Sequence, residues 1–174
     1  MRALQTATLL VATLGAGLMA GLFAAFAYAV MPGLARSADR TFVQAMQNIN
    51  RAIINGWFLL PFLLPVPLLI LATVLAWNGH GRVALPWVLA ALVLYMAGFF
   101  VTSGVNVPLN NALDKADIAS GKGDTGDDDR DRAARAAFEG RWVTWNIVRA
   151  LLHTAAFGVL ACALLLHGTA AGTT

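Results

Sequence analysis

The stretch Ala52–Gly81, AIINGWFLLPFLLPVPLLILATVLAWNGHG, contains no charged side chain. A helix needs roughly 20 predominantly apolar residues to cross the hydrocarbon core of a bilayer, so this stretch is long enough for one membrane span. Three further stretches are equally free of charge, and they cover residues 3–35, 83–113 and 150–174. The sequence therefore predicts an all-α integral membrane protein whose four spans pack as a helix bundle.

The composition of the chain agrees with this interpretation. The 174 residues are 59% hydrophobic and 12% charged, whereas soluble domains are about half apolar and about a quarter charged. We expect one membrane domain over residues 1–174, with spans at about 5–30, 53–77, 84–107 and 142–166. The basic pI near 9.6 is better explained by membrane topology than by nucleic-acid binding, so the expected surroundings are a lipid bilayer and no nucleic acid.

Basic residues gather on one side of the predicted membrane. Four spans place both termini on the same side, which with the 78–83 turn carries only Arg2 and Arg82. Cytoplasmic loops of membrane proteins are enriched in Lys and Arg. We therefore expect the 31–52 and 108–141 connections in the cytoplasm and both termini outside the cell (inner) membrane. The ten remaining basic residues are Arg36, Arg40, Arg51, Lys115, Lys122, Arg130, Arg132, Arg135, Arg141 and Arg149.

The first two spans carry special features. Ala25-Phe26-Ala27 resembles a signal-peptide cleavage site, but the uncharged stretch is about twice as long as the apolar region of a signal peptide, which favours a retained span. Gly17 and Gly21 begin a ridge of small residues that lets another helix approach, either within the chain or from a second copy in a homo-oligomer. In the second span Pro61, Pro65 and Pro67 each remove a backbone donor and predict a bent or partly opened helix beside a cavity.

The cytoplasmic connection 111–141 holds eight of the nine acidic residues. Gly121–Gly126 is typical of a flexible turn, and Asp127–Asp129 suit the N-terminus of a helix that continues into the fourth span. The ligand spacing of a calcium loop is missing. The predicted spans contain no carboxylate, which excludes a carboxylate-bridged metal centre in the membrane, and the single Cys162 allows no cysteine-based metal site. We expect no bound metal.

Polar side chains form a stripe on the predicted fourth helix. At 100° per residue, Trp142, Asn146, Arg149 and His153 fall within about 60° of one another. Arg149 would lie about 10 Å and His153 about 16 Å beyond Trp142 along the helix axis. Polar residues at such depth usually face the interior of a bundle and mark functional sites.

Two other helices contribute polar residues at the same level. Asn48, Arg51 and Asn55 share one face with Gln44 before the second span, and Asn106 and Asn110 share a face if the helix continues through Pro108. Together these stripes predict a polar pocket that opens toward the cytoplasm. Three interpretations remain open, namely a hydrogen-bonded clasp that only joins the helices, a small-molecule site, and a transport path. Trp142 and Trp145 are either interfacial anchors or pocket walls.

Four segments make the chain resemble a known family. They are Met31-Pro-Gly-Leu34, Met46-Gln-Asn-Ile-Asn50, Asn106-Val-Pro-Leu-Asn110 and Trp142-x-x-Trp145-Asn146-x-x-Arg149. Their order and spacing are similar to those of the anthrone oxygenase-like family of small four-span membrane proteins. The resemblance implies a type of protein found in aromatic polyketide pathways, some members of which oxidise anthrones to anthraquinones with molecular oxygen and no evident cofactor.

This resemblance implies roles for the polar stripes. A protein of this kind binds a flat, hydrophobic aromatic molecule, stabilises its anion and accepts a proton. We expect Trp142, Trp145 and Phe138 to stack on the rings and His153 to be the general base, in a monooxygenase that needs no cofactor. The expected oxyanion contacts are Arg149, Asn106, Asn110 and Asn146. Asn48, Arg51 and Asn55 are expected to line the pocket. Asn50 lies on the opposite helix face from Asn48, so the two cannot both line one pocket unless the helix begins after them. The alternative is a non-enzymatic carrier or scaffold.

Overall fold

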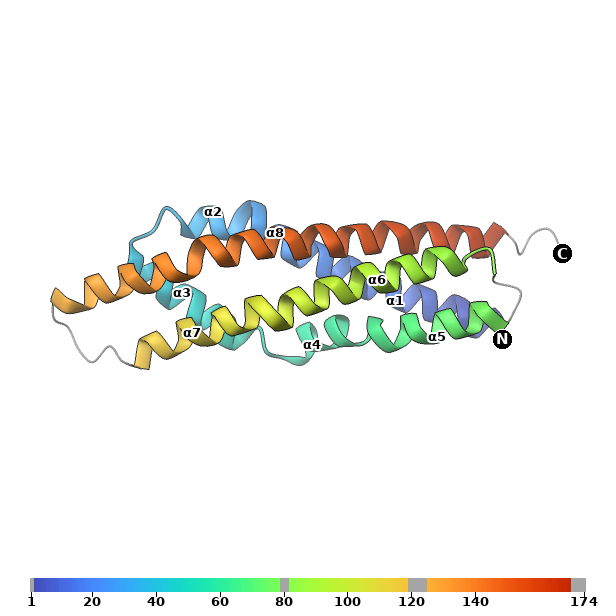
Figure 1. Cartoon of the computed structure of the whole chain (residues 1–174), viewed down its shortest axis with the longest axis horizontal. Coiled ribbons are helices and arrows are strands. Elements are labelled where there is room, and N and C mark those ends of the chain that lie inside the picture. The colour runs from blue at the N-terminus through green and yellow to red at the C-terminus, as the bar shows by residue number, and fades with distance from the viewer. Residues whose placement is uncertain (1, 79–81, 119–124, 170–174) are drawn as a thin grey trace.

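The structure is a computed structural model that describes residues 2–78, 82–118 and 125–169. All its described elements are helices, and they form four rods that run side by side (Figure 1). The first rod consists of α1 (Arg2–Ala25), the π-helical turn η1 (Phe26–Val30) and α2 (Met31–Leu34). The short helix α3 (Asp39–Ala52) connects it to the second rod, α4 (Gly56–Leu63) and α5 (Pro65–Asn78).

The third rod consists of α6 (Leu85–Val101), the π-helical turn η2 (Thr102–Asn106) and α7 (Val107–Ile118). The fourth is the single helix α8 (Thr125–Thr169). All four rods contain a helix long and apolar enough to cross a membrane, as the sequence predicted. The predicted membrane helical bundle is thus confirmed, and the protein is a multi-pass membrane protein.

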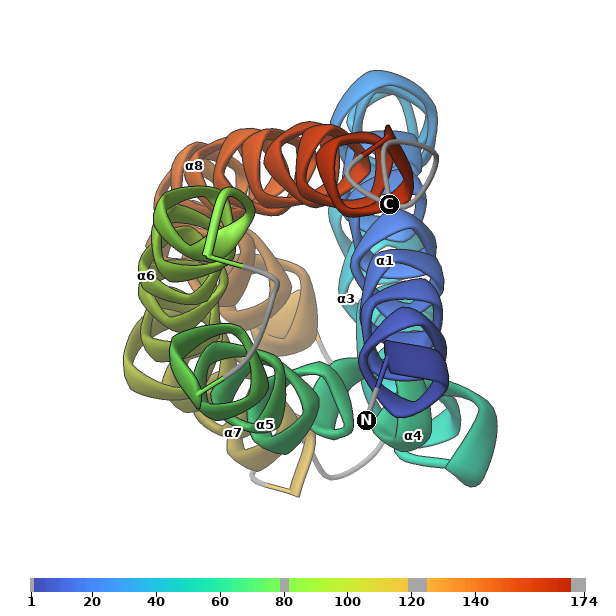
Figure 2. The same cartoon turned by 90° about the vertical axis from the view of Figure 1, so that its right-hand side faces the viewer.

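The rods form a closed ring in which α1 contacts α5 and α8, and α6 contacts the same two helices (Figure 2). Small residues fill much of its centre, and Ala12, Ala72, Ala91 and Ala156 are fully buried. Small side chains let membrane helices approach one another closely. Large apolar side chains such as Leu14, which is 66% exposed, face outward, which is the arrangement expected in lipid.

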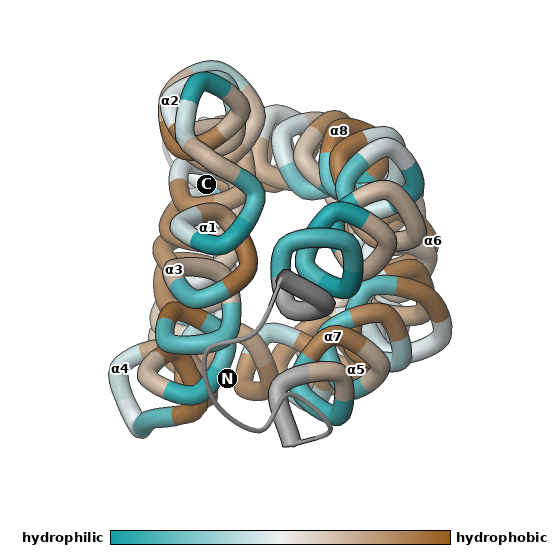
Figure 3. The backbone as a smooth tube through the Cα atoms, turned by 90° about the vertical axis from the view of Figure 1, so that its left-hand side faces the viewer, coloured by the Kyte–Doolittle hydropathy of each residue, from teal (hydrophilic) through white to brown (hydrophobic). Residues whose placement is uncertain are grey.

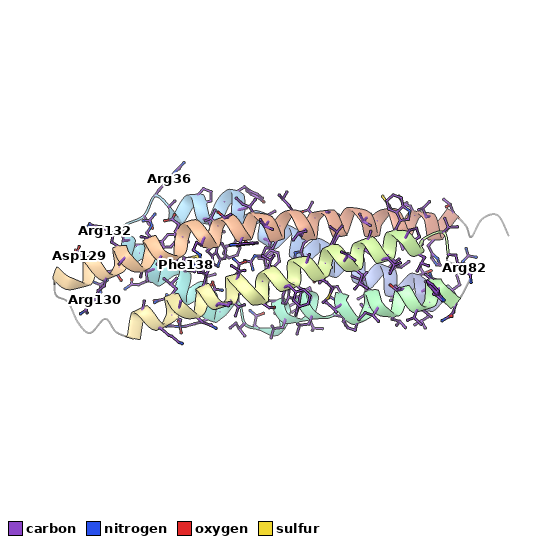
Figure 4. The ribbon with its side chains drawn as sticks, viewed as in Figure 1. Arg36, Arg82, Asp129, Arg130, Arg132 and Phe138 are labelled. Carbon is purple, nitrogen blue, oxygen red and sulfur yellow. The ribbon has the colours of Figure 1, made fainter. Side chains whose placement is uncertain are left out.

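The two ends of the bundle differ in polarity. Hydrophilic residues concentrate at the end that holds α3, the end of α7 and the start of α8, called here the α3 end (Figure 3). Arg36, Asp129, Arg130 and Arg132 lie at this end, whereas Arg82 lies at the end that holds both termini (Figure 4). This separation agrees with the predicted topology. The orientation toward the cytoplasm stays a prediction from the charges.

The second rod is interrupted where its prolines predicted a bend. α4 ends at Leu63 and α5 begins at Pro65. Because Pro65 has no N–H, the Pro61 carbonyl lacks its usual helical donor. The Tyr95 hydroxyl of α6 lies 3.0 Å from the carbonyl oxygens of both Pro61 and Phe62 and donates to them. Tyr95 therefore stabilises the interruption from a neighbouring rod.

The second span begins later than predicted. Residues 53–55 form a turn, and Asn55 caps α4 by accepting a hydrogen bond from the Phe58 N–H at 3.2 Å. The helix starts at Gly56, three residues after the approximate start at residue 53, because Asn55 satisfies a free N–H group of the helix that follows it. Asn55 has a structural role here, and it is not among the residues that line the cavity beside Arg149.

Both π-helical turns lie just before a proline. The N–H of Met31 donates to the Phe26 carbonyl before Pro32, and the N–H of Val107 donates to the Thr102 carbonyl before Pro108. A wider turn accommodates a proline because it separates the ring from the preceding carbonyl groups. The third rod therefore continues through Pro108 well past the predicted end at residue 107.

The predicted helix that runs into the fourth span is confirmed as the continuous helix α8. Of the predicted turn at 121–126, residues 121–124 lie outside the described part, and Thr125 and Gly126 already belong to α8. At the α3 end Arg135 joins α8 to the preceding chain, with Nη1 2.9 Å from Asp39 Oδ1 and Nη2 2.8 Å from the Ala35 carbonyl. This contact fixes the position of α3.

The two glycines of the small-residue ridge on α1 lie in different surroundings. A Cβ atom on Gly17 would lie 3.0 Å from the Phe157 ring of α8, whereas one on Gly21 would meet no described atom within 4 Å. Gly17 therefore serves packing within the chain. A homo-oligomer formed through the ridge stays a prediction, and Gly21 would be the residue available for it.

Candidate functional site

A cavity of about 340 Å³ lies among all four rods and α3. Its volume is in the range of small-molecule sites, which are usually apolar with a few polar groups. Half of the apolar lining residues are aromatic, namely Phe23, Phe26, Phe58, Phe62, Phe99 and Trp142, and the other half are aliphatic, namely Ile49, Ile53, Ile54, Leu59, Leu63 and Val107. The polar part consists of Asn50, Arg51, Thr102, Ser103, Asn110, Asn111, Asp114 and Arg149.

Arg149 is the buried cation of this cavity. It is only 6% exposed, and its Nε donates to Asn146 Oδ1 at 3.1 Å. Its Cζ lies 4.1 Å from the centroid of the Phe23 ring and 5.2 Å from that of Trp142. Within the described part of the chain no carboxylate pairs with it. A guanidinium held between two rings and without a counter-ion is suited to bind an anionic group in the cavity.

Asn146 and Asn106 hold the helices that carry the cavity. Both are buried, at 0% and 1% exposure. The Nδ2 of Asn146 donates to the Phe23 carbonyl at 3.0 Å, which directs its Oδ1 to Arg149. The Nδ2 of Asn106 donates to the Trp142 carbonyl at 3.3 Å. Neither side chain lines the cavity, so their contribution to the site is to position Arg149 and Trp142.

Asn110 and Trp142 form the wall between α7 and α8. The Nε1–H of Trp142 donates to Asn110 Oδ1 at 2.7 Å, and both residues line the cavity. The indole is 2% exposed. Of the two interpretations of Trp142, an interfacial anchor and a pocket wall, the structure favours the pocket wall.

His153 lies behind the cavity. Its imidazole is fully buried between Phe23 and Tyr95, with ring centroids 5.0 Å and 4.7 Å away, and it packs on Gly98. Its Nδ1 is 2.8 Å from the Arg149 carbonyl. Since a carbonyl only accepts, Nδ1 carries the proton and donates. Nε2 has no hydrogen-bond partner among the described residues. The expected general base therefore does not line the cavity.

Four other expected site residues also lie away from the cavity. Trp145 is 38% exposed and does not line the cavity. Asn48 is exposed, whereas Asn50, on the other face of α3, lines the cavity. Asn55 is the α4 cap. Phe138 is buried at the α3 end, where its ring stacks 5.9 Å from Trp142 (Figure 4).

The sequence interpretation missed two groups that line the cavity. Phe58 and Phe62 are four residues apart on α4 and stack at 5.3 Å, and Phe62 stacks in turn on Phe99 at 5.1 Å. Their helical spacing was a usable signal. Asp114 was assigned to the loop because the third helix was expected to end at residue 107. The continuation through α7 brings this carboxylate to the cavity, one turn after Asn110.

Asp114 is paired with Arg51 at the cavity wall. Its Oδ1 lies 2.7 Å from both Nη2 and Nε of Arg51. The two side chains are 40% and 51% exposed. Among the described residues no three His, Cys, Asp or Glu side chains gather in a group that would hold a metal ion.

Comparisons with known proteins identify the family but no individual relative. Neither the curated proteins nor the solved structures include a match to this chain. The model of the family described as anthrone oxygenase matches residues 51–159, which is more than half of the chain. This range contains the Asn106–Asn110 segment and the stripe from Trp142 to His153. The resemblance seen in the sequence is thereby confirmed, and the chain belongs to the anthrone oxygenase family.

Proposed function

We propose that this protein is a membrane-embedded oxygenase that oxidises a hydrophobic aromatic molecule of the anthrone or quinol type with molecular oxygen and without a bound cofactor. The observation that carries the proposal is the placement of Arg149, a buried cation without a carboxylate partner among the described residues, in an apolar cavity that six aromatic side chains help to line. The aromatic walls suit a flat apolar molecule, and the guanidinium suits one oxygen of it.

The chemistry of an anthrone matches these features. Loss of one proton from its central methylene gives an anion whose charge rests largely on the oxygen across the ring. This electron-rich anion reduces oxygen directly, and the methylene becomes a carbonyl while O₂ supplies that oxygen and one molecule of water. A preorganised positive group at the oxyanion lowers the barrier because it stabilises the charge as it develops. Arg149 is assigned this role.

Asn146, Asn106 and His153 act as positioning residues in this proposal. Asn146 directs Nε of Arg149, His153 donates to the backbone carbonyl of Arg149, and Asn106 holds the backbone of Trp142. The bond from Asn146 orients the guanidinium of Arg149 before a substrate enters, and the other two contacts hold the backbone of Arg149 and Trp142. The guanidinium then needs no rearrangement during the reaction.

The proposed orientation places the α3 end in the cytoplasm of the cell (inner) membrane and both termini outside. It is supported by the sequence, because ten of the twelve basic residues belong to the side of the membrane that contains the 31–52 and 108–141 connections. The cavity then receives a substrate made by cytoplasmic enzymes. Cysteine labelling on intact cells tests this orientation. A single cysteine replaces either Arg36 or Arg82, both of which are exposed, in a Cys162→Ser background, and a membrane-impermeant maleimide is added. We expect labelling at position 82 and none at position 36. Labelling at position 36 but not at 82 would reverse the orientation.

The catalytic role of Arg149 is tested by Arg149→Met, which keeps the length of the side chain and removes its charge. Purified protein in lipid nanodiscs is supplied with anthrone and oxygen, and anthraquinone formation is followed spectroscopically. We expect kcat/KM to fall by roughly 100-fold. Arg141→Met is the matched control, because Arg141 is exposed on the same helix, and it should keep the wild-type rate. Wild-type protein that forms no quinone above the spontaneous rate would refute the proposal.

A second candidate is a non-enzymatic carrier or scaffold whose polar residues only clasp the helices. It is favoured by the bonds of Asn106, Asn146 and His153 to backbone carbonyls. The two candidates differ in a ligand-stabilisation experiment, because a ligand that binds the native state raises its Tm. A scaffold predicts no change of Tm with anthrone or anthraquinone. The oxygenase predicts an increase that Arg149→Met abolishes.

A further inference from the structure

The proposed reaction needs a group that accepts the proton of the substrate carbon. Such a group must line the cavity and belong to the side chains that act as general bases toward carbon acids, which are carboxylates, imidazoles and amines. His153 does not meet the first condition, because its imidazole is fully buried and enclosed by Gly98, Phe23 and Tyr95. The amides, hydroxyls, indole and guanidinium groups of the lining do not meet the second. Among the described lining residues, Asp114 is the carboxylate that meets both conditions.

The placement of Asp114 relative to Arg149 suits a proton acceptor. Asn110 of α7 accepts from Trp142, whose ring lies 5.2 Å from the Arg149 guanidinium. Asp114 follows Asn110 by one helical turn, about 6 Å further along α7. Asp114 and Arg149 therefore line different parts of the same cavity. A flat ring system that places its oxygen at Arg149 extends its opposite edge toward Asp114.

Arg51 holds Asp114 in the absence of a substrate. The Oδ1 atom of Asp114 lies 2.7 Å from both Nε and Nη2 of Arg51, and both side chains are about half exposed. Exposed ion pairs of this kind are weak. An incoming aromatic ring can therefore displace the pairing, and the carboxylate then faces the substrate instead of the guanidinium.

We propose that Asp114 is the general base that removes the proton from the central methylene of the substrate. This inference rests on the proposed function for the class of substrate. The carbon–hydrogen bond breaks, its proton passes to a carboxylate oxygen of Asp114, and its electron pair moves through the ring to the oxygen held by Arg149. Ketosteroid isomerase provides a precedent, because an aspartate base there acts together with an oxyanion site on the far side of the substrate.

The proton transfer is measured separately from the oxidation by working without oxygen. Anthrone is incubated under argon in deuterated buffer with protein in nanodiscs, and the exchange of its methylene hydrogens is followed by NMR. We expect wild-type protein to exceed the spontaneous exchange rate and Asp114→Asn to lower this acceleration by roughly 100-fold or more. Asp129→Asn is the control, because Asp129 is 83% exposed at the same end and does not line the cavity, and it should exchange like the wild type.

A second variant separates loss of the base from loss of the fold. Asp114→Ala leaves space for a small carboxylate, so added formate should restore exchange in this variant and leave the wild type unchanged.

The outcomes distinguish the two proposals. Exchange by Asp114→Asn at the wild-type rate, or wild-type protein that does not accelerate exchange, overturns the role of Asp114. A third outcome separates the two proposals. If exchange depends on Asp114 but the protein forms no quinone when oxygen is admitted, the role of Asp114 as a base is supported and the oxygenase function is refuted. Restoration of exchange by formate in Asp114→Ala supports the role of Asp114 as the base. If Asp114→Ala has the wild-type Tm and formate does not restore its exchange, this role is contradicted.

Discussion

The imidazole of His153 on α8 lies directly against the backbone of Gly98 on α6, so that a Cβ atom at residue 98 would overlap its Cε1. The ring fills the space that the missing side chain leaves. It also donates to the Arg149 carbonyl at 2.8 Å. The contact between α6 and α8 is thus linked to the helical turn that carries the cation of the cavity.

This contact predicts that Gly98→Ala destabilises the protein. The added methyl group overpacks a buried site, which costs roughly 1–3 kcal/mol. Thermal unfolding in detergent measures it, with Gly104→Ala as the control because a Cβ at Gly104 meets no described atom within 4 Å. The destabilising effects of two substitutions are not additive when the two residues are in contact. The double variant Gly98→Ala/His153→Ala should therefore lose less stability than the sum of the two single variants, and an additive result would contradict the contact.

Tyr95→Phe should destabilise the interrupted second rod. The hydroxyl donates to the carbonyls of Pro61 and Phe62 at 3.0 Å, and its removal leaves a buried carbonyl without a donor. Hydrogen bonds between membrane helices contribute about 1 kcal/mol, and we expect a loss of that size in reversible unfolding. Tyr28→Phe is the matched control, since Tyr28 is 73% exposed. Equal losses in both variants would show that the carbonyl contacts contribute nothing.

Trp142→Phe should weaken the wall between α7 and α8 while it keeps an aromatic ring there. The lost bond from Nε1 to Asn110 Oδ1, 2.7 Å long, is expected to lower the stability by about 1 kcal/mol. The smaller stacking area of a phenyl ring relative to an indole should also lower the affinity for anthraquinone in a Tm-shift titration. Trp145→Phe, at a position that is 38% exposed and outside the cavity lining, should change neither quantity. If Trp145→Phe lowers the affinity for anthraquinone as strongly as Trp142→Phe does, the ligand does not bind in this cavity.

The two glycines of the α1 ridge should respond differently to a large side chain. Gly17→Ile drives a branched side chain into Phe157, so we expect a Tm decrease of several degrees. Gly21→Ile places the same group in open space and should leave the stability of the bundle unchanged. Light scattering in detergent on both variants tests the ridge as an interface between copies. If Gly21→Ile alone converts an oligomer to a monomer, Gly21 contacts a second copy.

Much of the fold follows from local patterns in the sequence. The absence of charge over four stretches determines the number of spans, because burial of a charged group in lipid is costly along any helix. Pro65 determines the interruption of the second rod, because a missing N–H is a local property. The stripe of Trp142, Asn146, Arg149 and His153 is confirmed as one buried face, because α8 is a single regular helix and the angular spacing of its residues stays constant.

The composition of the cavity depends on contacts between helices. Asn48 and Asn50 lie on opposite faces of α3, and only the packing of α3 on α7 and α8 decides that Asn50 lines the cavity. Asp114 reaches it because the third rod widens to a π turn at residues 102–106 and then continues. His153 is kept from it by Gly98, a residue 55 positions away in the sequence. The sequence alone determined the spans and the polar stripe, since hydropathy and helical periodicity act within one segment. Only the tertiary structure decided which polar groups face the cavity and which are enclosed, because the rotation and close approach of each helix are set by its neighbours.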